Sequence, residues 1–330
     1  MSKILKSSTL PLLHRLRRAA SLFAMGIGIA TSALSVNAQE ITIGEGIAVG
    51  WGQFFVADAH KLWEKQGLQP KVTTFASGRL VLDALVGGGV LIGTAAETPV
   101  AFANLNGLPV RVIGTINRHE PFDVVAKTEI KKLSDLKGKR VGYSQGTNAH
   151  YYLHKALAAG GLSLADITAV SLTPSDFVTS LVNGALDAFI WTEPHITHAL
   201  SQGKGRFHTI QTPGLYHTYS SIITLQSTID QKPELLIKAL KALLAADKQL
   251  KADPADAARI VGERVKLDND ILKAYWPRLQ FNLDLDKKAL VAELESQAKW
   301  AIENKIARPD AKLPDFNTVV VTHLLDAARK

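Results

Sequence analysis

The 330-residue sequence contains no cysteine. Disulfide bonds are therefore excluded, although an oxidising compartment would permit them. A lipid-modified N-terminal cysteine is excluded as well, so no lipid anchor of that kind would tether the chain to a membrane. The fold must be held by a hydrophobic core alone. About 290 residues follow residue 38, and a chain of that length can build such a core most easily as two lobes.

Acidic residues are absent from the first 38 positions, which instead carry five basic residues. An apolar stretch follows the basic start, and Val36 and Ala38 place small residues where a signal peptidase reads them. This order of features is typical of a signal peptide, so we expect residues 1–38 to be removed before Gln39. A membrane anchor is the alternative, because the stretch approaches the ~20 apolar residues of a span. Glycine, serine and threonine dilute it, which favours cleavage.

After residue 38 the sequence lacks a further apolar run long enough to span a bilayer, and it lacks a basic block. The full-length net charge of +8 comes largely from the five basic residues of the leader. Without them, 33 of the 38 basic residues face 30 acidic ones, which leaves a net charge of +3. We therefore expect a soluble chain, and no nucleic-acid partner.

Short apolar stretches alternate with helical patterns over most of the chain. The pattern predicts strands at 41–47, 71–75, 90–94, 110–115, 123–126, 139–143, 168–172, 187–191 and 219–225. It predicts helices at 53–66 and 78–86, another that opens with Thr98 as cap and Pro99 behind it, and two more at 148–159 and 175–182. This order predicts an α/β fold with parallel sheets covered by helices. From Pro233 only helices are predicted, at about 233–251, 255–264, 269–276, 287–304 and 316–328.

Ligand-type residues gather where the predicted strands end and helices begin. Ligands of open α/β sheets bind at this edge, and the first N–H groups of a helix suit anions. Five junctions stand out, at 46–53, 77–79, 97–99, 144–148 and 191–195. The candidate ligand-binding residues at these junctions are Trp51, Gln53, Ser77, Gly78, Arg79, Thr98, Gln145, Gly146, Thr147, Asn148, Trp191 and Glu193.

Each junction also has a purely structural interpretation. Trp51 can be a packed core residue, and Ser77 and Thr98 can be simple helix caps. Glu193 stands at the expected start of a helix, where it either complements the helix dipole or receives an amine of the ligand. The junction 144–148 combines hydroxyls, an amide and a glycine, which favours contact with a ligand.

The sequence signatures of nucleotide binding, metal binding and nucleophilic catalysis are absent. The loop 144–148 has no Gly-Lys-Ser/Thr ending, so it is not a P-loop. The pairs His150 with His154 and His195 with His198 have neither cysteine support nor an acid in a recognised ligand pattern, so we interpret them as helix-surface histidines. No Gly-x-Ser-x-Gly elbow occurs. We expect no catalytic residue, no metal and no cofactor.

Residues 133–143 read LSDLKGKRVGY and are followed by Gly146-Thr147. They resemble the DLKGKRV…G(S/T) signature of substrate-binding proteins of nitrate/sulfonate/taurine ABC importers. Further fragments in the family's order lie at 67–68, 77–78, 92–99, 161–162, 166–167, 172–176, 184–189 and 193–194. In one departure, Thr192 stands where the family usually has a tryptophan before the acid and proline, and Trp191 lies one position earlier. The shifted aromatic residue leaves the substrate open within the family.

The resemblance implies a two-lobed periplasmic binding protein fold with a hinge and a central ligand cleft. It implies a first lobe at 39–125, a second at 126–219, and a return to the first lobe at 220–330 with a helical tail. It also implies a periplasmic monomer that binds a small anionic ligand and delivers it to a membrane-embedded ABC permease. The expected function is capture of an aliphatic sulfonate, taurine or nitrate without chemistry.

Two alternatives stay open at this point. Trp51, Trp191 and Tyr143 could stack on a pyrimidine or another aromatic, thiamine-precursor-like ligand. A periplasmic enzyme on the same scaffold is the second alternative, and the missing nucleophile–base or metal set argues against it.

Overall fold

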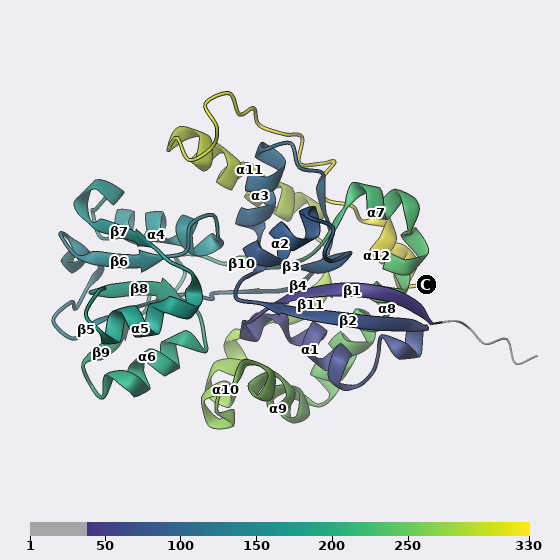
Figure 1. Cartoon of the computed structure of the whole chain (residues 1–330), viewed down its shortest axis with the longest axis horizontal. Coiled ribbons are helices and arrows are strands. Elements are labelled where there is room, and N and C mark those ends of the chain that lie inside the picture. The colour runs from purple at the N-terminus through teal and green to yellow at the C-terminus, as the bar shows by residue number, and fades with distance from the viewer. Residues whose placement is uncertain (1–37) are drawn as a thin grey trace, which may run out of the picture. The chain divides into compact units, whose positions relative to one another are not determined.

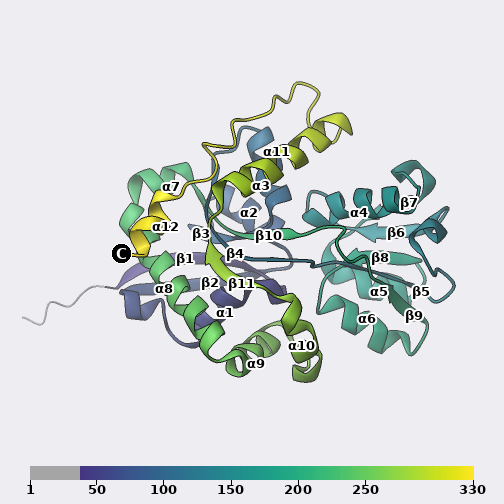
Figure 2. The same cartoon turned by 180° about the vertical axis from the view of Figure 1, so that it is seen from behind.

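Two β-sheets, each flanked by helices, make up residues 38–330, the part of the chain that the structure describes (Figures 1 and 2). The structure is a computed structural model. The expected signal peptide lies outside the described residues, apart from Ala38. No helix within residues 38–330 is long and apolar enough to cross a bilayer.

The first sheet has six strands and carries the beginning of the described chain. Their spatial order is β11 (Phe281–Asp284), β4 (Val110–His119), β10 (Thr218–Leu225), β3 (Ile92–Ala95), β1 (Gln39–Gly46) and β2 (Leu68–Phe75). β1 pairs in parallel with β2 and β3. β10 runs antiparallel to β3 and β4, and β11 antiparallel to β4.

The second sheet has five strands. Their spatial order is β7 (Thr168–Ser171), β6 (Arg140–Tyr143), β8 (Ala188–Trp191), β5 (Asp123–Lys127) and β9 (Phe207–Ile210). β6 is parallel to β7 and β8, whereas β5 is antiparallel to β8 and β9. The sheets are therefore mixed, so the expectation of parallel sheets holds for β1–β3 and β6–β8 but not for β4, β5 and β9–β11. β4 runs from the first sheet directly into β5 of the second, so no helical crossover sets the direction of β5.

The chain passes between the sheets twice. It leaves the six-stranded sheet through residues 120–122 and returns through residues 211–217, between β9 and β10. The expected lobe boundaries near 126 and 219 remain a prediction.

Twelve α-helices cover the two sheets within the described residues (Figure 1). The first six are α1 (Gly52–Ala59), α2 (Gly78–Val86), α3 (Glu97–Leu105), α4 (Asn148–Ala159), α5 (Phe177–Val182) and α6 (His195–Gly203). The C-terminal part adds α7 (Gln226–Gln231), α8 (Pro233–Ala252), α9 (Pro254–Val265), α10 (Asn269–Tyr275), α11 (Lys287–Glu303) and α12 (His323–Ala328). The 3-10 turns are η1 (Val49–Trp51), η2 (Glu64–Gln66), η3 (Leu133–Leu136), η4 (Leu164–Asp166), η5 (Pro174–Asp176) and η6 (Trp276–Arg278).

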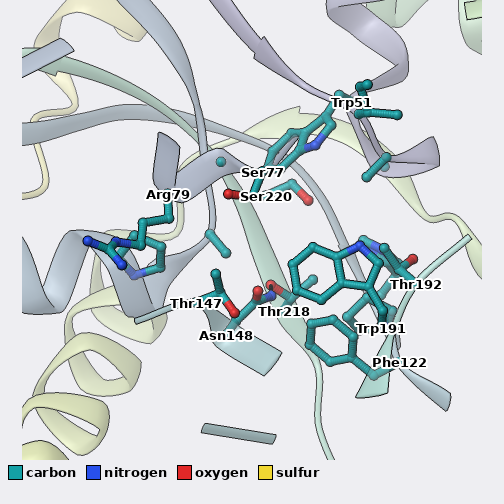
Figure 3. Close-up of a pocket in the computed structure, with 18 of the residues that line it drawn as sticks. Trp51, Ser77, Arg79, Phe122, Thr147, Asn148, Trp191, Thr192, Thr218 and Ser220 are labelled. Atoms are coloured by element: carbon teal, nitrogen blue, oxygen red, sulfur yellow. Dashed lines mark hydrogen bonds between the residues drawn. The ribbon is translucent and has the colours of Figure 1, made fainter. Parts of the chain in front are cut away.

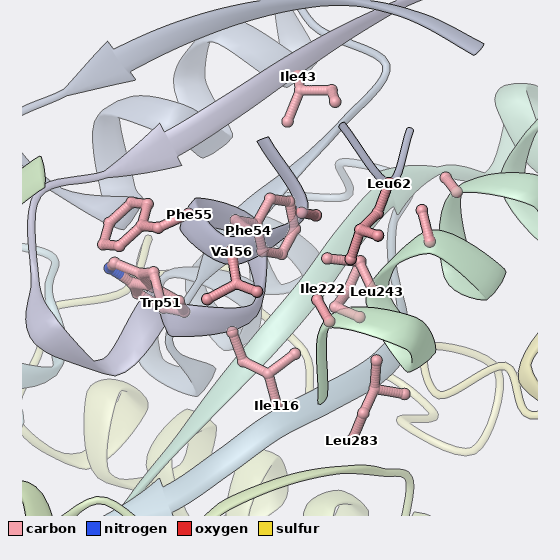
Figure 4. Close-up of a cluster of buried hydrophobic side chains, with 14 of the residues drawn as sticks. Ile43, Trp51, Phe54, Phe55, Val56, Leu62, Ile116, Ile222, Leu243 and Leu283 are labelled. Carbon is pink, nitrogen blue, oxygen red and sulfur yellow. The ribbon is translucent and has the colours of Figure 1, made fainter. Parts of the chain in front are cut away.

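The core of the six-stranded sheet has two sides. Ile222 and Ile223 are neighbours in β10 yet belong to different buried clusters, because successive strand side chains point to opposite faces. On one side α8 buries an apolar stripe that includes Leu243, which packs with Phe54 of α1 (Figure 4). On the other side α11 packs against α3. The C-terminal helices thus cover the sheet that begins the described chain.

Four sequence-based assignments need correction, and one of them is the helix expected at 316–328, which begins only at His323. The helix expected at 53–66 ends at Ala59, because Lys61 adopts a positive φ of 52° that stops it. The region after Pro233 is not purely helical, because β11 pairs with the edge strand β4. β9 is likewise a strand that the pattern misses. Pairing with β5 and β4 makes β9 and β11 strands, and their own sequence does not encode that pairing.

Candidate functional site

A cavity of about 560 Å³, including its mouth, lies between residues of the two sheets. Its lining comes from the carboxyl ends of β1, β2, β3, β6 and β8 and from β4 and β10, as expected for ligand sites of open α/β sheets. Its lining residues are Ile47, Ala48, Gly50, Trp51, Ala76, Ser77, Gly78, Arg79, Ala96, Pro99, His119, Pro121, Phe122, Thr147, Asn148, Trp191, Thr192, Thr218 and Ser220 (Figure 3).

The N-termini of α2 and α4 contribute adjacent parts of this lining. Ser77 is the N-cap of α2, and its hydroxyl oxygen accepts the N–H of Leu80 at 3.4 Å. The hydrogen of that hydroxyl stays free to donate, because a hydroxyl both accepts and donates. Thr147 occupies the N-cap position of α4, but its hydroxyl donates to the carbonyl oxygen of Ser144 at 2.7 Å. The two caps therefore differ: only Ser77 offers an uncommitted hydroxyl hydrogen to an anion.

Gly78 follows the first cap and has no room for a side chain. A Cβ at this position would lie 2.9 Å from the Cα of Ala95 and 3.1 Å from the carbonyl oxygen of Thr94. The start of α2 is thus pressed against β3, which keeps its first N–H groups at the cavity. These N–H groups have no intrahelical partner and carry partial positive charge.

The charged and ionisable lining residues are Arg79 and His119, and no carboxylate lines the cavity within the described residues. Arg79 donates from Nη1 to the carbonyl oxygen of Gln145 at 3.2 Å and lies 3.7 Å from Asp83. It therefore reaches from α2 to the loop before α4. Burial lowers the pKa of His119 to about 3, with smaller contributions from Arg278 and His217, so this imidazole is neutral at pH 7.

Three aromatic side chains form apolar walls. Trp51 comes from η1, whereas Phe122 and Trp191 come from the five-stranded side and lie with ring centroids 6.0 Å apart (Figure 3). Phe122 also stacks on Tyr216 at 6.1 Å. The indole Nε1 of Trp191 is buried and has no hydrogen-bond partner among the described residues. The cavity thus combines an apolar surface with a few polar groups, the usual composition of small-molecule sites.

Comparison with known proteins identifies this architecture. The family model described as NMT1/THI5 like matches residues 51–257, more than half of the chain. The chain belongs to the NMT1/THI5-like family.

Relatives of this NMT1/THI5-like chain have names that refer to binding. A putative aliphatic sulfonates-binding protein of Escherichia coli (strain K12) is 27% identical over 311 residues, which cover 79% of this chain and 93% of that protein. The alkanesulfonate-binding protein SsuA from Xanthomonas axonopodis pv. citri, bound to MOPS, aligns with a TM-score of 0.77 at 21% identity, covering 86% of this chain and 98% of that chain. The periplasmic aliphatic sulphonate binding protein SsuA from Escherichia coli aligns with a TM-score of 0.72 at 22% identity, covering 86% and 92%. The predicted α/β periplasmic binding protein fold is confirmed.

Seven of the twelve candidate residues of the NMT1/THI5-like chain line the cavity. They are Trp51, Ser77, Gly78, Arg79, Thr147, Asn148 and Trp191. Asn148 donates from Nδ2 to the hydroxyl of Thr218 at 2.9 Å, which joins α4 to β10 at the cavity wall.

Three other candidates lie in the structural framework around the cavity. Gln53 is fully buried and donates to the carbonyl of Ile116 at 2.7 Å and to Asp247 at 2.9 Å. Thr98 is not the cap of α3, because the helix already begins at Glu97, and its hydroxyl donates to Gln297 instead. The carboxylate of Glu193 accepts from the N–H and hydroxyl of Thr197 at 3.1 and 3.0 Å, which corresponds to the helix-stabilising interpretation.

Gln145 and Gly146 lie on the far side of Arg79, in a neighbouring groove with Asp83 and Phe102. Gly146 has a φ of +76°, which a glycine adopts without strain. A Cβ there would meet the Arg79 side chain at 3.2 Å. Both residues therefore position Arg79 rather than line the main cavity.

The interpretation of the histidine pairs as surface residues is wrong for His150, which is 3% exposed. Its ring packs 4.9 Å from Tyr143 and 5.4 Å from Trp300, so Tyr143 is occupied there and does not line the cavity. Burial, with a smaller effect of His154, lowers the pKa of His150 to about 4. No group of three or more histidine, aspartate or glutamate residues that could hold a metal ion occurs in residues 38–330.

The sequence patterns miss five cavity residues that come from β4, β10 and the first passage between the sheets: His119, Pro121, Phe122, Thr218 and Ser220. These segments are antiparallel or irregular, whereas the search followed strand-to-helix junctions. The polar residues Thr218, Ser220 and Ser221 in the first half of β10 are the signal from which part of this wall could have been found.

Proposed function

We propose that this chain is the solute-binding component of an ABC import system and captures a small organic anion of the sulfonate class without chemistry. The signal-peptide pattern at residues 1–38 supports export to the periplasm. The family resemblance, together with relatives that are named as sulfonate-binding proteins, supports a membrane-embedded permease as the partner. A monomer is sufficient for this role, because the described cavity is built from a single chain.

The observation that carries the proposal is the chemistry of the cavity. Its lining presents an arginine, the N-termini of α2 and α4 and no carboxylate. Helix N-termini bind anions through free N–H groups and the helix dipole. An anionic head group would be held by the Ser77 hydroxyl, the N–H groups at Gly78 and Asn148, and the field of Arg79. Charge-assisted hydrogen bonds are roughly twice as strong as neutral ones.

The passages at residues 120–122 and 211–217 connect the parts that would close on the ligand. We expect a hinge movement about them, because cavity residues come from both sheets. Small-angle scattering should then give a smaller radius of gyration when ligand is bound.

A thermal-shift screen tests the function. The panel contains aliphatic and aromatic sulfonates, taurine, nitrate, sulfate esters and pyrimidines. A ligand at 100 times its Kd adds about 2.7 kcal/mol of stability, which such a screen detects. Stabilisation by sulfonates, with little effect of the pyrimidines, is the expected result. Stabilisation by pyrimidines alone would establish the alternative ligand class. A separate assay with the purified protein, in which sulfate esters are turned over, would establish an enzyme.

A further inference from the structure

At the end of β4, Asn117 and His119 form a short hydrogen-bond chain in which every donor and acceptor can be assigned. The side chain of Asn117 contacts the backbone carbonyl oxygen of Gly50, which can only accept a hydrogen bond. The Nδ2 of Asn117 must therefore face Gly50, and its Oδ1 faces His119. That Oδ1 lies 2.7 Å from Nδ1 of His119 and can only accept, so Nδ1 carries a hydrogen.

The remaining ring nitrogen of His119 is then an acceptor. The imidazole is buried, which keeps it neutral at pH 7, and a neutral imidazole with a protonated Nδ1 has a lone pair on Nε2. Nε2 has no hydrogen-bond partner among the described residues, and His119 lines the cavity. The ring cannot easily turn away, because a Cβ at Gly50 would lie 2.9 Å from its Cε1, so η1 is packed tightly against it. A ligand in the cavity therefore meets a fixed hydrogen-bond acceptor.

The rest of the lining adds flat apolar surface and further donors, among them the indole of Trp191 and the hydroxyl of Thr192. Trp51, Phe122 and Trp191 are all less than a tenth exposed and line the cavity. Stacked or edge-on contacts with such rings favour a planar ligand over a flexible alkyl chain. The unpartnered Nε1 of Trp191 is a buried donor in the same lining, and such groups are normally satisfied.

We propose that the ligand is an organic anion with a planar ring and a hydrogen-bond donor, such as a hydroxyl or amine, which Nε2 of His119 accepts. The proposal rests on the proposed function and narrows its substrate class. The anionic head group accepts hydrogen bonds from the N–H groups at the helix N-termini, and the ring contacts the aromatic walls. The donor of the ligand forms a hydrogen bond with Nε2 of His119. His119 would then determine specificity.

Three matched probes test the proposal by calorimetry on the exported protein at pH 7. They are 4-hydroxybenzenesulfonate, 4-methylbenzenesulfonate, in which a methyl replaces the donor, and hexanesulfonate, which has no ring. The hydroxyl compound should bind roughly 10-fold or more tightly than the methyl compound, because the latter leaves a buried acceptor unpaired. The methyl compound should in turn bind more tightly than hexanesulfonate.

Variants then assign the preference to one residue. His119→Leu should reduce the hydroxyl-to-methyl ratio to about one, whereas His119→Gln, which keeps an acceptor oxygen, should retain part of it. His323→Leu, at an exposed histidine of α12, is the matched control and should leave the ratio unchanged. Circular dichroism and binding of 4-methylbenzenesulfonate report whether each variant is folded.

The outcomes separate this proposal from the proposed function. Equal binding of the hydroxyl and methyl compounds to wild type, or an unchanged ratio in His119→Leu, would overturn the role of His119 and leave sulfonate capture intact. Hexanesulfonate binding as tightly as 4-methylbenzenesulfonate would overturn the requirement for a ring. If none of the three probes binds but another sulfonate of the screen does, this proposal fails alone, whereas if no sulfonate of the screen binds, the proposed function fails with it.

Discussion

The two helix caps at the cavity allow a sharp comparison, because one hydroxyl is free to donate and the other is not. Ser77 uses a lone pair for the N–H of Leu80 and keeps its hydrogen. Thr147 commits its hydrogen to the carbonyl of Ser144. We therefore expect Ser77→Ala to remove a hydrogen bond to the anion and Thr147→Val, which keeps the shape of the side chain, to remove none.

The magnitudes follow from the kind of bond that is lost. A hydrogen bond to a charged group is worth about 1.5 to 3 kcal/mol, so Ser77→Ala should weaken sulfonate binding roughly 10- to 100-fold. The same change removes a helix cap, but the cap bond is long at 3.4 Å, so the cost in unfolding free energy should be near the low end, about 0.5 kcal/mol. Thr147→Val should cost about 1 kcal/mol of stability and change affinity less than about 3-fold.

Calorimetry with a sulfonate identified in the screen measures both affinities, and urea denaturation measures both stabilities. The expected pattern is a crossover: the Ser77 variant loses mainly affinity, and the Thr147 variant loses mainly stability. A Thr147→Val protein that loses as much affinity as Ser77→Ala would refute the reasoning, because it would mean that the Thr147 hydroxyl turns toward the ligand.

Further predictions concern the backbone, the charge and the pH dependence. Gly78→Val should lower unfolding free energy by about 1 to 3 kcal/mol in urea denaturation and weaken binding, because its Cβ would lie 2.9 Å from a backbone Cα of β3. Arg79→Gln should weaken anion binding about 3-fold at low salt and much less at 0.5 M salt (roughly a 4 Å screening length), because the guanidinium is about half exposed. Lowering the pH from 7 towards 4.5 should lower the urea midpoint of unfolding. The pKa values of His119 and His150 in the folded protein are about 3 and about 4, below the unfolded value near 6.5. The stability that these two histidines contribute is therefore present above pH 6.5 and is lost on acidification. Glu97 opposes this trend. Because its pKa is raised to about 7 in the folded protein, it contributes stability that is present at low pH and is lost as the pH rises towards 7. A urea midpoint that rises on acidification would mean that Glu97 outweighs the histidines.

Local pattern was sufficient for much of the fold. The helices α2 and α4 have the expected bounds, because Gly78 and Asn148 follow extended N-cap residues and glycines stand at their C-terminal ends. The short strands β9 and β11 could not be predicted, because pairing with β5 and β4 rather than their own sequence makes them strands. The antiparallel strands also depend on where the chain passes between the sheets, which no local period encodes.

The candidate site could be predicted where the residues that start a helix are also the residues that could bind a ligand. Ser77, Gly78 and Thr147 lie at helix starts, and helix starts can be read from local sequence. His119 could not be found in this way, because its role depends on Asn117 beside it and on η1, which is distant in sequence. The general rule is that caps can be predicted from local sequence, whereas the state of a buried side chain depends on contacts that only the fold provides.

Glu97 is a buried carboxylate next to the proposed anion-binding cavity, and its surroundings show how it is accommodated there. It is fully buried and accepts hydrogen bonds from the hydroxyl of Thr218 at 2.9 Å, the N–H of Tyr219 at 3.0 Å and the amide of Gln297 at 3.0 Å, and from the hydroxyl of Tyr216. Burial, followed by the charge of Glu293, nevertheless raises its pKa to about 7, so part of the population is neutral at that pH.

The donors to Glu97 come from the returning segment (Tyr216), from the start of β10 (Thr218 and Tyr219) and from α11 (Gln297), whereas Glu97 itself is the first residue of α3. Thr218 also accepts the Nδ2 of Asn148 at the N-terminus of α4. One continuous hydrogen-bond chain therefore runs from Asn148 at the start of α4, through Thr218 of β10 and Glu97 of α3, to Gln297 of α11. The hydroxyl of Thr218 is the link, because it accepts from Asn148 and donates to Glu97.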